Sequence, residues 1–136
     1  MPHLSRRKLD YKVEKELLES FEYVLTHSSP NELKKILSSL MTKTERLMIA
    51  KRLGIAMMLK EKISDSTIDE VLKVTRFTVN KIALLFAAKP EGFFLALEKL
   101  KQRQIKNSLK NILLELAAYA AAAAGGRLPR KKYPRS

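Results

Sequence analysis

Residues 65–84 read DSTIDEVLKVTRFTVNKIAL, and this stretch decides the fold. Counted from Asp65 as the first position, aliphatic residues occupy the fourth, eighth, tenth, fifteenth and eighteenth positions: Ile68, Leu72, Val74, Val79 and Ile82. Two short helices can cross over a shared core only if these positions are apolar. The spacing therefore predicts a helix-turn-helix, with Thr75 as the N-cap of its second helix.

Two positions depart from the usual pattern of this motif. The ninth position, commonly a glycine in the turn, is Lys73, and the fifth, usually a small residue, is Asp69. A lysine in the left-handed conformation costs about 1 kcal/mol, which a folded domain tolerates. The alternative interpretation of the pattern is a plain helical hairpin inside a bundle.

In a helix-turn-helix, the first residues of the second helix approach base edges in the major groove of DNA. We therefore expect Arg76 to bind a guanine edge and Asn80 an adenine edge. Phe77 would press on a thymine methyl group, with a place in the hydrophobic core as the alternative. Thr78 would meet either bases or phosphate.

Further polar residues lie where the phosphate backbone would pass. Lys81, Ser66 and Lys73 would fix the register of the protein on DNA without carrying sequence information. The predicted DNA-binding residues are therefore Ser66, Lys73, Thr75, Arg76, Phe77, Thr78, Asn80 and Lys81.

Outside this motif, apolar residues recur at intervals of three and four, so we expect an all-α fold without strands. Capping boxes open two helices, at Ser29 with Glu32, followed by Pro30, and at Thr42 with Glu45. The expected helices span about 10–25, 30–40, 43–62, 66–73, 76–88, 91–104 and 105–124. The first carries one apolar stripe, Val13, Leu17, Phe21 and Val24. The second should bury Leu33, Ile36, Leu37 and Leu40, and the sixth should pack Phe93, Phe94, Leu97 and Leu100.

The helix expected over 43–62 is apolar on more than one face. Its hydrophobic residues are Leu47, Ile49, Leu53, Ile55, Met57, Met58 and Leu59. A helix of this kind has to be surrounded, and a second copy of so short a chain could supply the missing surface. This pattern favours an intertwined homodimer; the alternative is the central helix of a monomeric bundle.

The domain organisation follows from composition. We expect a basic N-terminal arm over 1–9, a helical dimerisation and helix-turn-helix domain over 10–104, and an alanine-rich C-terminal helix over 105–124. Gly125 and Gly126 end that helix, and residues 125–136 form a basic tail that we expect to be disordered.

The chain carries 27 Lys and Arg against 14 Asp and Glu, a net charge of +13. Such a field attracts polyanions, nucleic acid first among them, although RNA-binding, ribosome-associated and membrane-surface proteins share it. No apolar stretch reaches the length of a membrane span and there is no cysteine, so we expect a cytoplasmic protein. The two histidines, His3 and His27, and the absence of a phosphate-binding glycine loop predict no enzyme and no metal site.

Residues 40–82 resemble the Trp repressor superfamily. Thr42, Glu45 and Arg46 match the T-x-x-E-R opening of a long helix that leads into a helix-turn-helix, and weaker similarity extends from Lys12 to Leu100. The resemblance implies an intertwined two-fold dimer on a pseudo-palindromic DNA site with half-sites about one helical turn apart. It implies a sequence-specific DNA-binding transcriptional regulator acting as a repressor; the alternative is an RNA- or ribosome-associated basic helical protein.

Members of this superfamily that respond to tryptophan hold it between two arginines. Arg52 stands at the first of these places and Lys81 at the second, and Ile82 replaces a neighbouring glycine. Lysine lacks the planar guanidinium that stacks on an indole ring, and Ile82 would fill part of the pocket. We therefore expect no tryptophan corepressor and no other cofactor. Any effector pocket would consist of Thr42, Arg52 and Lys81, and the resemblance leaves the effector itself unassigned.

Overall fold

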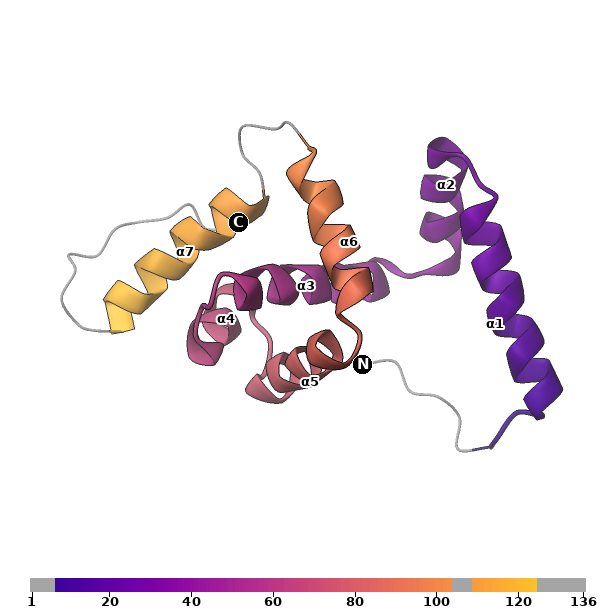
Figure 1. Ribbon diagram of the computed structural model, residues 1–136, viewed down its shortest axis with the longest axis horizontal. Coiled ribbons are helices and arrows are strands. Elements are labelled where there is room, and N and C mark those ends of the chain that lie inside the picture. Colours follow the sequence, from indigo (N-terminus) through magenta and orange to yellow (C-terminus); the bar gives the residue numbers. More distant parts are fainter. Residues whose placement is uncertain (1–6, 104–108, 125–136) are drawn as a thin grey trace. The chain divides into compact units, whose positions relative to one another are not determined.

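The computed structural model describes residues 7–103 and 109–124, and every regular element within them is a helix (Figure 1). The all-α prediction is therefore confirmed for this part of the chain. The helices are α1 (Tyr11–Thr26), α2 (Pro30–Leu40), α3 (Lys43–Lys60), α4 (Asp65–Leu72), α5 (Arg76–Ala88), α6 (Pro90–Lys101) and α7 (Leu109–Ala124). None of them combines the length and the apolarity needed to cross a membrane.

The chain divides into two compact units, Met1–Ile49 and Ala50–Ser136, and α3 begins in the first and ends in the second. Both predicted capping boxes are present in the first unit. Ser29 N–H donates to Glu32 Oε1 at 2.9 Å, and Glu32 N–H donates to Ser29 Oγ at 3.2 Å. Thr42 and Glu45 make the same pair of bonds, at 2.9 and 3.1 Å. The backbone N–H of each cap residue lowers the pKa of its glutamate.

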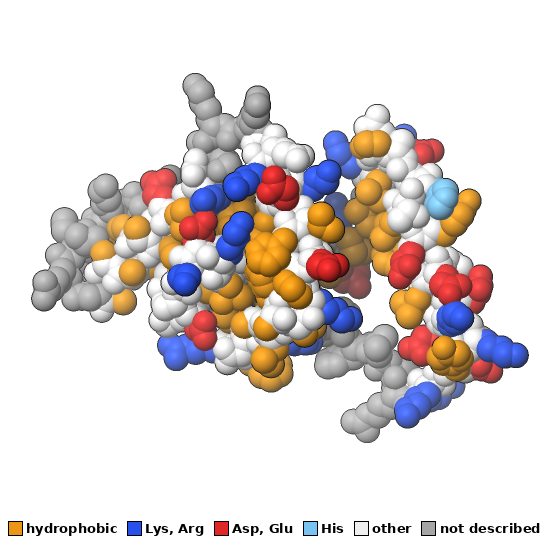
Figure 2. Space-filling model, viewed as in Figure 1, with side chains coloured by type: hydrophobic (Ala, Val, Ile, Leu, Met, Phe, Trp, Pro, Cys, Tyr) orange, Lys and Arg blue, Asp and Glu red, His pale blue; other side chains and the backbone are white. Residues whose placement is uncertain are grey.

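The first unit has no buried residue in either α1 or α2. The four residues of the predicted stripe on α1 are 39–56% exposed: Val13, Leu17, Phe21 and Val24. Leu40, expected on the buried side of α2, is 60% exposed, whereas Leu33, Ile36 and Leu37 are half-buried. Among residues 7–103 and 109–124, the stripe of α1 is thus left uncovered, and the predicted buried side of α2 is only partly buried, with Leu40 exposed. Figure 2 shows hydrophobic side chains at the surface where α1 and α2 lie.

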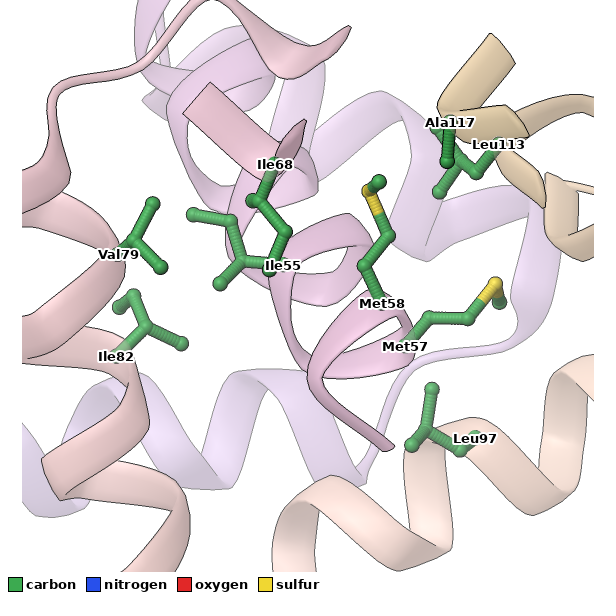
Figure 3. Close-up of a cluster of buried hydrophobic side chains, with 9 residues drawn as sticks. All are labelled: Ile55, Met57, Met58, Ile68, Val79, Ile82, Leu97, Leu113 and Ala117. Atoms are coloured by element: carbon green, nitrogen blue, oxygen red, sulfur yellow. The ribbon is translucent and has the colours of Figure 1, made fainter. Parts of the chain in front are cut away.

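The second unit contains the hydrophobic core. Residues Gly54–Met58 of α3 are all buried, so this stretch of the helix is enclosed on every side as expected. Leu47 and Ile49, in its first half, are 53% and 54% exposed, so the expectation is wrong for them in the single chain. Ile68 from α4, and Val79 and Ile82 from α5, pack into the same core, which Leu97, Leu113 and Ala117 complete from α6 and α7 (Figure 3). Full burial stabilises each large aliphatic side chain by roughly 1.5–3 kcal/mol relative to exposure.

Several helix ends differ from the prediction for local reasons. α3 ends at Lys60, because Lys62 has a left-handed φ of 59° and the N–H of Ile63 bonds back to Met58. α4 begins one residue earlier than expected, because Ser64 rather than a later residue accepts the N–H of Thr67. Phe94, expected in the core, is 47% exposed and packs edge-on against Phe86. The expected helix over 105–124 is described only from Leu109 onward.

Candidate nucleic-acid interface

The turn between α4 and α5 consists of residues 73–75. Lys73 has φ 55° and ψ 53°, and its N–H bonds to the carbonyl oxygen of Asp69, which also accepts the N–H of Val74 at 3.3 Å. The expected left-handed lysine is therefore confirmed at the position where glycine is usual. The carbonyl of Lys73 accepts a further hydrogen bond, at 3.3 Å, from the side-chain ammonium of Lys51 on α3.

The predicted crossing of α4 and α5 over one core is confirmed. Ile68, Val79 and Ile82 are at most 1% exposed. In Figure 3, Val79 and Ile82 reach from α5 toward Ile55 and Ile68. Leu72 and Val74, the other two members of the pattern, are partly buried against the same cluster. The face of α5 that carries Val79 and Ile82 is thus fixed against the protein, which turns its opposite face outward.

That outward face carries the residues expected to meet base edges. Arg76, Phe77 and Asn80 are exposed, and so is Lys81. The ring of Phe77 is 78% exposed, so its alternative assignment to the core is wrong. Leu84, which was not among the predicted residues, continues this face one turn further and is 71% exposed. Its spacing of seven residues from Phe77, about two helical turns, is the feature of the sequence that indicates a shared face.

Thr75 and Thr78 act together at the start of α5. Thr75 is the N-cap, as predicted, and its hydroxyl accepts the N–H of Thr78 at 3.1 Å. The two hydroxyl oxygens are also 3.1 Å apart and hydrogen-bonded to each other. Both groups therefore have partners within the protein, and their contact with DNA stays a prediction.

Two of the residues expected at phosphates lie at opposite ends of α4. Ser66, in the first turn of α4, is exposed, with its hydroxyl 3.4 Å from that of the N-cap Ser64. The ammonium of Lys73 lies 3.5 Å from the carboxylate of Glu70, and both side chains are largely exposed. Such a pair contributes little to stability and leaves the lysine available to a stronger anion.

The charged side chains of α5 are all positive. Its sequence, RFTVNKIALLFAA, contains Arg76 and Lys81 and no acidic residue. Positive charge on the outward face of a helix, next to amide and apolar groups, suits a polyanion that also presents base edges. Within residues 7–103 and 109–124, no group of three His, Cys, Asp or Glu side chains is placed to hold a metal ion.

The three residues of the hypothetical effector pocket lie at the N-cap of α3, within α3 and on α5. The hydroxyl of Thr42 caps α3 by accepting the N–H of Glu45, Arg52 is half-buried on α3, and Lys81 is exposed on α5. Thr42 belongs to the first unit, and the other two belong to the second. An effector pocket stays a prediction. The predicted tail over 125–136 and residues 1–6 of the predicted arm lie outside the described residues.

Comparison with protein families gives a direct match. The family model described as Trp repressor protein matches residues 15–101, which is more than half of the chain and includes both helices of the helix-turn-helix. α7 lies beyond the matched residues. Neither the curated proteins nor the solved structures include a match to this chain. Members of the matched family are DNA-binding regulators with a helix-turn-helix, the motif that α4 and α5 form here. The chain therefore belongs to the Trp repressor family.

Proposed function

We propose that this protein is a sequence-specific transcriptional repressor that reads the major groove of duplex DNA with the outward face of α5. The observation that carries the proposal is the exposure of Phe77, at 78%, on the first turn of a helix whose opposite face is buried. A large ring left in water at this position has no role in the fold of the single chain. It lies beside Arg76 and three residues before Asn80, the two side chain types that pair with guanine and adenine edges.

In this mechanism, each side chain of the outward face has a separate task. The guanidinium of Arg76 donates two hydrogen bonds to O6 and N7 of a guanine, and the amide of Asn80 pairs with N6 and N7 of an adenine. Phe77 contacts the methyl group of a thymine, and Leu84 extends the apolar contact along the helix. Lys81 and Lys73 bind phosphates on either side of the groove.

The N-terminus of α4 offers a further phosphate contact. A helix start carries partial positive charge and unpaired backbone N–H groups. Ser66 lies in the first turn of α4 and its hydroxyl is exposed. It would donate a hydrogen bond to the phosphate that lies at this N-terminus. These contacts fix the angle at which α5 enters the groove. Repression follows from occupancy, because bound protein excludes other proteins from the same stretch of duplex.

We further propose that the DNA-binding species is a homodimer. The apolar stripe of α1, which includes Leu17 and Phe21, is exposed in the single chain, and contiguous exposed apolar surface on this scale usually marks an interaction site. A second copy supplies an identical stripe, and two-fold symmetry places two copies of α5 on one pseudo-palindromic site. No tryptophan is required in this proposal, because Lys81 replaces an arginine that would stack on the indole.

The first experiment selects bound duplexes from a random pool and measures the affinity of the recovered site by fluorescence anisotropy. Arg76→Ala and Asn80→Ala should each lower discrimination at one base pair by about 1–3 kcal/mol, and Phe77→Ala should weaken the preference for thymine. The matched controls change an arginine, an asparagine and an exposed aromatic ring elsewhere on the surface: Arg103→Ala, Asn31→Ala and Tyr11→Ala. Unchanged sequence preference in the α5 variants would contradict the proposal.

The same assay with structured RNA separates the alternative function. A DNA repressor should prefer the selected duplex to structured RNA at every salt concentration, and its affinity should fall steeply with salt because bound phosphates release counterions. Equal or tighter binding of structured RNA would favour an RNA- or ribosome-associated role instead.

The oligomeric state needs its own measurement. Sedimentation equilibrium should give twice the mass of one chain for the wild type. The double variant Leu17→Gln/Phe21→Gln removes apolar surface from the stripe and should dissociate at lower protein concentration. Glu16→Gln/Glu22→Gln changes exposed acids on the same helix and should leave the mass unchanged. A wild type that sediments as a monomer at all concentrations would contradict the homodimer.

A further inference from the structure

α4 is too short to be stable by its own hydrogen bonds. It has eight residues, and isolated helices shorter than about 12 residues are marginal in water. Its position therefore depends on the elements that pack against it. These include α3, against which Ile68 and Leu72 pack, and the two helices on either side of α4 in the view of Figure 1, α5 and α7.

α7 contacts the core through residues one helical turn apart. Leu113 and Ala117 are its buried residues, at 4% and 3% exposure. Figure 3 places both of them near Met58, on the side of the cluster away from Val79 and Ile82. α7 thus covers the side of the core that α5 leaves open, and α4 is enclosed between two helices.

Gly54 marks the point on α3 where α4 and α7 meet. A Cβ atom at Gly54 would lie 3.3 Å from Cδ1 of Leu72 on α4 and 3.6 Å from Cδ1 of Leu113 on α7. The glycine gives both leucines room against the backbone of α3. The same point therefore sets how closely α4 and α7 approach the core.

A polar contact holds the start of α7. The ammonium of Lys110 lies 2.9 Å from Oε1 of Glu61, which follows the last residue of α3. This hydrogen bond lowers the pKa of Glu61 and keeps its carboxylate charged. Because Lys110 lies three residues before Leu113, the ion pair and the apolar contact act on successive positions of one helix face.

Further along α7 the packing is incomplete. A hollow of about 280 Å³ lies between α7 and the segment that leads into α4. Its walls include Lys62, Ser64 and Thr67 on one side, and Ala117, Ala118 and Ala121 on the other. The small alanine side chains leave this space unfilled, so α7 is held firmly near Leu113 and more weakly near Ala121.

We propose that α7 is a positioning element of the helix-turn-helix: by holding α4, it sets the orientation in which α5 meets DNA. This inference rests on the proposed function. α7 lies outside the residues that match the family, so it is a feature of this chain rather than of the matched region. Loosening α7 should weaken DNA binding although α7 carries none of the predicted base-contacting residues.

The experiment measures binding of the selected duplex by full-length variants, at a temperature where each is folded by circular dichroism. Leu113→Ala should lower affinity about tenfold, a typical size for coupling between two sites, and should speed amide exchange in α4. Ile112→Ala is the matched control, because Ile112 is the neighbouring residue on α7 and is 44% exposed. An equal loss in both variants would overturn the proposal.

For Glu61→Gln, bulk electrostatics and the positioning role of α7 predict opposite changes in DNA affinity. It removes the ion pair with Lys110 and also one negative charge, so bulk electrostatics predicts tighter DNA binding. The positioning role predicts binding weaker by a factor of about 3, as suits the loss of a half-exposed ion pair. Glu115→Gln, at an exposed acid on α7, removes the same charge without touching α3 and should not weaken binding.

A gain of function completes the design. Ala121→Leu places an apolar side chain in the hollow and should slow amide exchange in α4 and tighten DNA binding. Failure of the wild type to bind any duplex would overturn the proposed function itself. Normal binding by the wild type with unchanged affinity in Leu113→Ala, Glu61→Gln and Ala121→Leu would overturn only the role of α7.

Discussion

The side-chain nitrogen of Lys51 donates a hydrogen bond to the carbonyl oxygen of Lys73, across 22 positions of sequence. The bond ties the middle of α3 to the turn of the helix-turn-helix. A turn carbonyl without a helical partner has to find one elsewhere, and here a long side chain from the central helix supplies it.

Lys51→Met should therefore loosen the turn while keeping most of the apolar stem of the side chain. We expect a loss of about 1 kcal/mol in the free energy of unfolding by urea, together with faster amide exchange at residues 73–75. Lys34→Met, at an exposed lysine of α2, is the control and should change neither quantity. Identical exchange in the two variants would show that the bond does not hold the turn.

Lys73→Gly should separate the backbone role of this residue from its charge. Relief of the left-handed conformation outweighs the greater freedom of glycine in the unfolded chain, so we expect a gain of roughly 0.5–1 kcal/mol in stability. Lys62→Gly, at the other lysine with a positive φ, should give a similar gain. Only Lys73→Gly should reduce the slope of log affinity against log salt by about 0.9, the value for one phosphate contact. Equal slopes in the two variants would place Lys73 away from DNA.

Thr75→Ala should remove the N-cap of α5. The lost hydrogen bond to the N–H of Thr78 should cost about 1 kcal/mol of stability, whereas Thr75→Ser keeps an oxygen in place and should cost much less. Urea unfolding of the three proteins measures the difference. Equal losses for alanine and serine would mean that the methyl group, rather than the cap, is what matters at this position.

Ile82→Ala and Leu84→Ala should separate the two faces of α5. Ile82 is buried, so its truncation should cost roughly 2–5 kcal/mol of stability. Leu84 is exposed, so its truncation should leave stability within about 0.5 kcal/mol of wild type and weaken DNA binding instead. Full DNA affinity in Leu84→Ala would limit the contact surface to the first two turns of α5.

The ion pair of Glu61 with Lys110 should make the contact of α7 sensitive to acid. Since the pKa of Glu61 is lowered from its ordinary value of 4.5 in the folded protein, the stabilisation is complete above that value. It is lost as the pH falls through the lowered pKa. Methyl signals of Leu113 should therefore shift at acidic pH in the wild type and in Glu115→Gln. The shift should be reduced in Glu61→Gln, and an unaltered titration there would contradict the assignment.

Local signals in the sequence were sufficient for the helix-turn-helix and its caps. Ile68, Val79 and Ile82 follow the spacing that a crossing of two helices requires, and Thr75 caps the next helix through a residue three positions away. Both capping boxes are equally local. Such features depend on neighbours within a few residues, so their partners are visible in the chain itself.

Features that depend on distant partners were not predictable. The stripe on α1 has the period of a buried face, yet periodicity does not identify what covers it, and among residues 7–103 and 109–124 it stays exposed. The bond from Lys51 to the turn and the contact of α7 with α4 join residues far apart in sequence. Leu84 carries no polar group that would indicate a contact with bases, and an aliphatic residue within an apolar helix segment is as typical of a buried face as of an exposed one.

The contact between α7 and α4 also bears on the order in which the protein is made. Chains fold from the N-terminus during synthesis, at a pace of about 5–20 residues per second. α4 and α5 leave the ribosome before α7, so for some seconds α4 has α5 beside it but not α7. Translation that stops after α6 releases a chain in which the side of α4 facing α7 is bare.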